Sequence, residues 1–125
     1  MVVLSAAILN KSGKVLVARQ FVEVTRMRVE GLLSSFTKIL GGRQATDHTY
    51  FETEAVRYIY QPLEFGYLVL VTNKSSNIVE DLDVLRLLAK VLPEFCVSGI
   101  SEDAVLDHAF DIIFAFDEVQ ENLNL

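Results

Sequence analysis

The sequence predicts an α+β domain in which a five-stranded antiparallel sheet carries one helix on one face and a helix pair on the other. Two observations lead to this class. Apolar residues alternate or run together in five short segments, and they recur at helical spacing in three longer ones. These segments follow the order ββ-α-βββ-αα, and the short connections between consecutive strands favour antiparallel pairing. With no linker or internal repeat in its 125 residues, the chain is expected to form one domain over residues 1–125.

The first part of the chain predicts a hairpin followed by a helix. Residues 2–10 and 15–20 are rich in β-forming side chains, and the turn sequence between them, 11–14, contains a glycine. The spacing then becomes helical, with Thr25 as a suitable N-cap and the glycines at 41–42 as a stop signal. The apolar face of this helix consists of Val29, Leu32, Leu33, Phe36 and Leu40.

Three further strands are predicted at residues 48–52, 56–61 and 67–72. Pro62 is expected to end the middle strand, because proline cannot donate a hydrogen bond to a strand ladder. The third strand is apolar almost throughout. It is therefore expected to lie at the centre of the sheet, with both of its faces buried.

Two helices are predicted after the sheet. Asn77 is expected to cap the first, Pro93 to end it, and Ser101 to open the second. The apolar stripe of the first comprises Ile78, Leu82, Leu85, Leu88, Ala89 and Leu92. That of the second comprises Val105, Leu106, Ala109, Phe110, Ile113 and Phe116. Asp81 and Asp83 are expected to be solvated acids near a helix N-terminus, where the helix dipole favours negative charge.

Charge and hydropathy exclude several classes of function. A net charge of −6 disfavours nucleic-acid binding. Residues 1–74 hold nine Lys/Arg and six Asp/Glu, whereas residues 75–125 hold two Lys/Arg and eleven Asp/Glu. This uneven charge is expected either to form two ordinary solvated faces or to steer the docking of partner proteins. No apolar run approaches the ~18 to 20 residues that cross a bilayer, so no transmembrane segment is expected. One cysteine and no recognisable secretory signal indicate a cytoplasmic location.

No combination of residues in the sequence predicts catalysis or metal binding. His48 and His108 occur in no HxxxH or HExxH pattern, and the glycines at 41–42 do not form a phosphate-binding loop. Cys96 is expected to behave as a small buried apolar residue. The chain is therefore expected not to be an enzyme and to use neither a cofactor nor a metal.

Two segments, residues 19–28 and 57–67, carry more arginine and aromatic side chains than a core requires. Arginine and tyrosine are the residue types that anchor protein interfaces. The candidate partner-binding residues are Arg19, Phe21, Arg26, Arg28, Arg57, Tyr58 and Tyr60. An equally supported interpretation is that the aromatic residues form cross-strand pairs and the arginines are only solvated.

Several motifs resemble those of one known family. They are RQFVE at 19–23, RVEGLL at 28–33, ETEAVRYIYQP at 52–62, SNIVEDLDVLRLL at 76–88 and FAFDE at 114–118. Together they resemble the N-terminal longin-type, SNARE-like domains of the coatomer delta family over most of residues 1–120. The strand and helix order of that fold is the one expected here from periodicity.

The resemblance implies a structural role in the COPI coat, which acts in Golgi-to-ER retrograde and intra-Golgi vesicle transport. It implies docking to other coat subunits, chiefly the beta-subunit trunk, and indirect membrane association through Arf-type GTPases. The implied location is cytoplasmic, peripheral on Golgi membranes and COPI-coated vesicles, and the chain would be the N-terminal domain of a longer subunit. Alternatives are a longin module of another trafficking protein (a SNARE, a clathrin-adaptor medium or small chain, or a tethering-complex subunit) and a small-molecule-binding or enzymatic domain of profilin-like shape.

Overall fold

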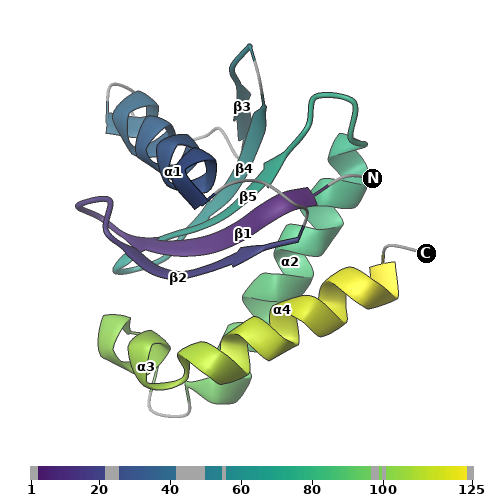
Figure 1. Ribbon diagram of the computed structural model, residues 1–125. Helices are drawn as coiled ribbons and strands as arrows, with labels where there is room; N and C mark the ends of the chain where they lie inside the picture. Colours follow the sequence, from purple (N-terminus) through teal and green to yellow (C-terminus); the bar gives the residue numbers. More distant parts are fainter. Residues whose placement is uncertain are drawn as a thin grey trace.

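Five strands form one antiparallel sheet in the order β2-β1-β5-β4-β3, with α1 on one face and the other helices on the opposite face (Figure 1). This computed structural model describes residues 3–21, 26–41, 50–54, 56–96, 99 and 101–123. The elements are β1 Val3–Asn10, β2 Val15–Gln20, α1 Arg26–Gly41, β3 Tyr50–Glu52, β4 Arg57–Pro62, β5 Gly66–Thr72, α2 Ile78–Phe95, α3 Glu102–Asp107 and α4 Ala109–Leu123. The predicted class, strand order along the chain and division of helices between the two faces are confirmed. The expected cap at Thr25 and the start of the third strand at 48–49 lie outside the described residues.

The central position of β5 is also confirmed. It pairs with β1 on one side and β4 on the other, so that Val69 lies opposite both Ala7 and Tyr60. Side chains alternate across a strand. Val69 therefore faces α1, while Leu68 and Leu70 face the helices on the other side. A strand covered on both faces needs apolar residues at its odd-numbered and at its even-numbered positions. This is why apolar and polar residues do not alternate in β5.

Two glycines allow the sheet to close tightly. Gly13 has φ +95° in the β1–β2 turn, and Asn10 supports this turn because its side-chain oxygen accepts from the Lys14 N–H at 2.9 Å. A Cβ at Gly13 would also lie 2.5 Å from the Thr37 side chain of α1. At Gly66 a Cβ would collide with the Leu9 carbonyl oxygen and lie 2.7 Å from the Asn10 Cα. Glycine at 66 is thus required by the close approach of β1 and β5.

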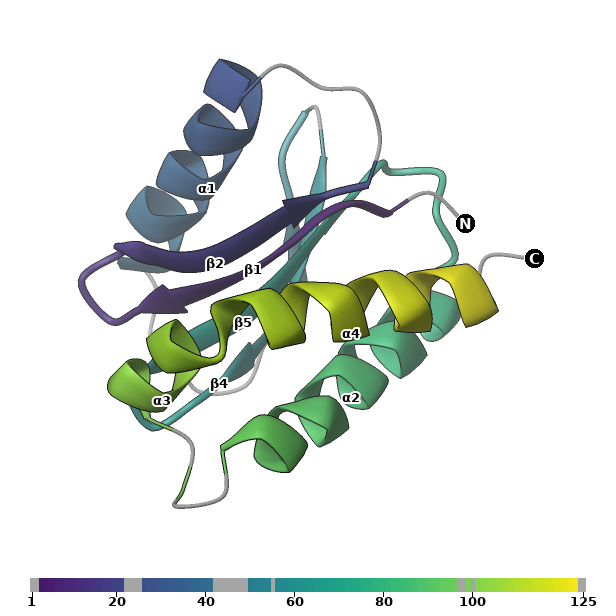
Figure 2. The same ribbon diagram turned by 60° about the horizontal axis from the view of Figure 1, so that its bottom comes forward.

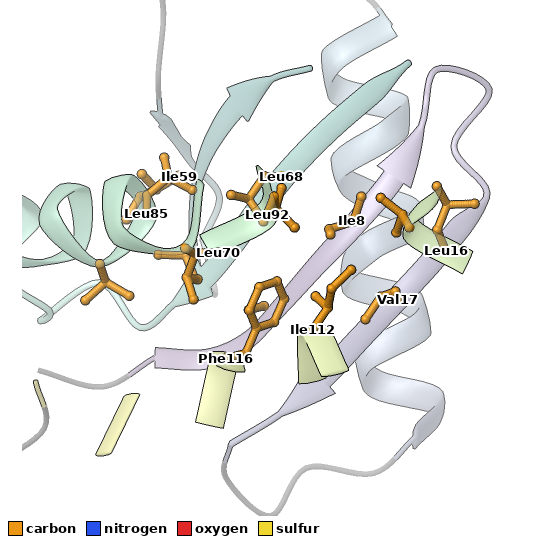
Figure 3. Packing of buried hydrophobic residues seen from close by; sticks show 14 of the residues in the cluster. Ile8, Leu16, Val17, Ile59, Leu68, Leu70, Leu85, Leu92, Ile112 and Phe116 are labelled. Atoms are coloured by element: carbon orange, nitrogen blue, oxygen red, sulfur yellow. The ribbon is translucent and has the colours of Figure 1, made fainter. Parts of the chain in front are cut away.

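The two faces of the sheet bury different kinds of side chain. Beneath α1 lies a cluster that we call the aromatic cluster, with buried members Ala7, Leu9, Leu33, Phe36, Phe51, Val56, Tyr58, Tyr60, Val69 and Val71. On the opposite face lies the aliphatic cluster, built by β1, β2, β4, β5 and the other three helices (Figures 2 and 3). Its labelled members in Figure 3 are Ile8, Leu16, Val17, Ile59, Leu68, Leu70, Leu85, Leu92, Ile112 and Phe116.

Helix α2 begins as predicted but ends later. The Asn77 side-chain oxygen accepts hydrogen bonds from the Val79 and Glu80 N–H groups at 2.9 and 3.3 Å. Pro93 was expected to end the helix, yet it lies inside the last turn and α2 continues to Phe95. Packing explains the difference: Leu92 is fully buried and Phe95 packs against the aliphatic cluster, which offsets the hydrogen bond that proline cannot make.

The last helical segment differs from the prediction in two ways. It is two helices, α3 and α4, separated at His108, where the backbone leaves helical geometry at φ −110° and ψ 22°. The buried positions are Val105, Ile112 and Phe116, whereas Leu106 and Phe110 of the predicted stripe are exposed. The segment has more apolar residues than one helix face can bury. Ile112 and Phe116, seven and eleven positions after Val105, are fully buried, whereas Ala109 and Ile113 pack against the cluster but are only partly buried.

Candidate interaction surface

Arg19 links β2 to α4 at the surface. Its Nε donates to the Asp117 Oδ1 at 2.8 Å, and the side chain remains 46% exposed. Phe21 follows β2, is partly buried, and packs against the aliphatic cluster. Arg19 is therefore reachable by a partner, whereas most of the packing of Phe21 is internal.

Arg26 and Arg28 lie in the first turn of α1, as the sequence predicts. Their side chains lie outside the described part of the structure. The placement of the backbone is consistent with the expected helix N-terminus, and their contribution to partner binding stays a prediction.

Tyr58 and Tyr60 belong to the core and not to the surface. They are 1% and 3% exposed, beneath α1 in the aromatic cluster. The Tyr58 hydroxyl donates to the Leu32 carbonyl at 2.7 Å, and its ring lies 5.0 Å from that of Phe51. Burial raises the pKa of Tyr58 above its ordinary value. Of the two interpretations left open by the sequence, the structure favours cross-strand packing for these rings.

Arg57 is also largely internal. Its side chain is 12% exposed, and its Nε donates to the Glu52 Oε1 at 3.1 Å. Its other nitrogens donate to the Ser76 and Lys74 carbonyls at 2.8 and 3.1 Å. Arg57 thus ties β4 to the connection between β5 and α2, which leaves little of it for a partner.

Asp81 corrects the expectation of a solvated acid. It is fully buried, accepts from the Ser76 hydroxyl at 2.7 Å, and lies 3.8 Å from the Arg57 guanidinium. Burial raises the pKa of Asp81, and the Ser76 hydrogen bond and the Arg57 charge oppose this shift. Its position four residues after the N-cap turns it toward the sheet, which helix periodicity could have revealed.

The described residues contain no group of three or more His, Cys, Asp or Glu side chains that could hold a metal ion. Cys96 is buried, as expected, and burial raises the pKa of its thiol, so the thiol stays protonated at neutral pH. The His108 Nδ1 lies 3.6 Å from the Asp111 Oδ2, three residues further along the chain. Among the helices described, none has the length and apolarity to span a membrane.

Sequence reasoning missed one exposed feature. Leu106, Phe110 and Phe114 are 44%, 81% and 67% exposed on α3 and α4, and we call them the α3–α4 patch. The apolar stripe predicted from the sequence places Leu106 and Phe110 in the core, and it does not include Phe114. Around the helix, these three residues are offset by about a third of a turn or more from Val105, Ile112 and Phe116. This offset is the sequence signal that could have identified them as exposed.

The fold defines the class of this protein. A chain in a homology model of the full-length AP-3 complex in a stretched open conformation matches it with a TM-score of 0.79 over 97% of this chain and 82% of that chain, at 14% identity. The chain thus has the longin-like α+β fold found in adaptor-complex subunits. No family model matches the sequence.

The curated proteins that the sequence resembles are coatomer delta subunits. The chain is 60% identical over 119 residues to coatomer subunit delta-2 of Oryza sativa subsp. japonica, covering 94% of this chain and 22% of that protein. It is 58% identical over 120 residues to coatomer subunit delta of Dictyostelium discoideum, covering 95% and 21%. The chain spans about a fifth of the length of these curated relatives. It is homologous to coatomer delta subunits and matches their N-terminal domain.

Proposed function

We propose that this chain is the N-terminal domain of a structural subunit of the COPI vesicle coat. The observation that carries the proposal is its identity of 46–60% to coatomer delta subunits over about 95% of its residues. The longin-like fold that it has in common with an AP-3 chain supports an adaptor-like place in a coat. In this role the domain acts by docking to other coat subunits in Golgi-to-ER retrograde and intra-Golgi transport.

The finer details of the proposal come from the family resemblance. The main partner is the trunk of the beta subunit, and Arf-type GTPases bring the assembled coat to the membrane. The domain works on the cytoplasmic side of Golgi membranes and COPI-coated vesicles, and it transforms no substrate. The buried, protonated Cys96 and the surface position of the His108–Asp111 pair are consistent with a binding role.

Co-purification with a beta-subunit trunk fragment tests the proposal. We expect the 125-residue chain and the trunk to elute as one complex at micromolar concentration. Of the predicted anchors, Arg19 has an exposed side chain and Arg26 and Arg28 lie in the first turn of α1, so replacing all three by alanine should weaken binding. Lys14→Ala/Lys90→Ala, at two exposed lysines elsewhere, is the matched control.

Each outcome has a distinct meaning. If the triple variant binds as well as the wild type, these arginines are not part of the interface. If the unmodified chain fails to associate with the trunk or with any other coat subunit, the proposed role is contradicted.

A further inference from the structure

The α3–α4 patch is the most exposed group of large apolar side chains that lie together in the described part of the chain. Phe110 and Phe114 are four residues apart, so their rings are neighbours on one side of α4. In Figure 2, α4 lies in the foreground, and no other helix or strand of the described residues lies in front of it. Contiguous apolar surface of this kind in a water-soluble domain marks a binding site or an aggregation hazard.

The core of the domain does not use this surface. Ile112 and Phe116 fill the space between α4 and the sheet, and both are fully buried (Figure 3). Phe110 and Phe114 point away from that face, because they are offset from it around the helix. They can therefore be replaced without opening a cavity in the aliphatic cluster.

Acidic side chains surround the patch. Asp103, Asp107, Asp111 and Glu118 are all exposed on the same two helices. None of Asp103, Asp107 and Glu118 forms an ion pair with a described lysine or arginine, and Asp111 has only His108 at 3.6 Å. An apolar centre with an acidic rim is complementary to an apolar surface with a basic rim.

We propose that the α3–α4 patch is a docking surface for an α-helix of a partner protein whose apolar side is flanked by lysine or arginine. Phe110 and Phe114 are separated by one helical turn, about 6 Å along the axis, which suits apolar anchors spaced three or four residues apart on the partner helix. The acidic rim opposes a second copy of this chain, because two such rims would face each other, and it opposes an anionic membrane. That the helix belongs to another coat subunit rests on the proposed function.

Binding of a labelled model helix to the full 125-residue chain tests this surface. The probe is a helix of about 18 residues, or five turns, with leucine on one side and lysine on the other; a second probe has glutamate in place of lysine. We expect micromolar binding of the lysine helix alone, and we expect Phe110→Ser/Phe114→Ser to weaken it about tenfold or more. Serine and phenylalanine have similar helix propensities, so α4 should persist, which circular dichroism verifies.

Two further variants separate the apolar from the electrostatic contribution. Asp107→Asn/Asp111→Asn/Glu118→Gln should also weaken binding, with a smaller dependence on salt. Val79→Ser removes another exposed apolar side chain, 64% exposed on α2, and should have no effect. Equal binding of the glutamate helix, or unchanged affinity of the double phenylalanine variant, would overturn the proposal. So would patch-dependent dimers in sedimentation, or patch-dependent binding to phosphatidylserine vesicles in place of the helix.

Reconstitution with coat subunits separates this inference from the proposed function. A chain that binds the lysine helix through the patch but joins no coat subunit would keep the docking surface and remove the coat role. A double phenylalanine variant that joins the coat as well as the wild type would keep the coat role and overturn the assignment of the patch to it.

Discussion

The two faces of the sheet are held by different interactions. On the α1 face, Phe36 contacts four rings with centroid distances of 5.5–6.0 Å, and the Tyr58 hydroxyl donates a neutral hydrogen bond to the Leu32 carbonyl of the helix. On the opposite face, many aliphatic side chains share the packing, and ionic contacts of Arg19 and Arg57 lie at its margins. The packing of α1 centres on the Phe36 ring, with Leu33 beside it, whereas the helices of the other face spread their contacts over many side chains. Truncation of a central side chain should therefore lower the free energy of unfolding more on the α1 face than on the opposite face.

Removal of the central ring should have the largest effect. Phe36→Ala deletes all four ring contacts, so we expect a loss of about 4–5 kcal/mol in the free energy of unfolding. Leu88→Ala, at an equally buried position of the aliphatic cluster, should lose about 3 kcal/mol, because neighbouring side chains can adjust. Urea titration measures both, and Ser35→Ala on the exposed side of α1 is the control. A larger loss for Leu88→Ala would invert the comparison.

The ionic contacts of the second face should differ sharply in strength. Arg57→Met leaves Asp81 buried without its cation and two carbonyls without a donor, so we expect a loss of about 3 kcal/mol. Arg19→Met breaks an exposed pair and should lose less than about 1 kcal/mol. Thermal unfolding of the two variants at equal pH gives the ranking, and equal losses would contradict the structural role assigned to Arg57.

The second face should also respond to pH through Asp81. Its pKa is raised in the folded state, so the folded protein holds this proton more tightly than the unfolded chain does. The stability that this protonation provides is complete below the ordinary value of 3.8 and is lost as pH rises through the folded pKa. Relative to Asp81→Asn, the wild type should therefore gain stability when pH falls from neutral toward 3.8. Urea titrations across this pH range measure the difference in free energy of unfolding between the wild type and Asp81→Asn. Asp83→Asn controls for removal of one charge from α2. A difference that does not change with pH would refute the prediction.

The polar contact under α1 should have a small effect, comparable to that of the exposed Arg19–Asp117 pair. Tyr58→Phe keeps the ring and removes only the hydroxyl that donates to Leu32, so we expect a loss of about 1 kcal/mol. Chemical denaturation resolves a change of this size. A loss close to that of Phe36→Ala would mean that the hydrogen bond, and not the ring packing, holds α1.

The distribution of apolar residues was sufficient to predict the sheet, its central strand and the assignment of helices to faces, because β5 is apolar almost throughout and α1 has a clear helical spacing. It was insufficient where apolar residues are in excess. At α4 the sequence offers Phe110, Ile112, Phe114 and Phe116 within seven positions, and only contact with the sheet decides which are buried. Tyr58 and Arg57 show the same limit: residue types suited to interfaces are equally suited to the core and to internal ion pairs.

The close approach of β1 and β5 at Gly66 has a consequence for genetic variation. Any single-base missense change of a glycine codon introduces a Cβ atom, and here that atom would meet the backbone of Leu9 and Asn10, where the start of β5 pairs with the end of β1. Neither an alanine nor a serine at 66 leaves the two strands in place. Missense alleles at this codon should therefore behave as loss-of-function alleles through depletion of the protein in cells, whatever surface the domain uses to bind its partners.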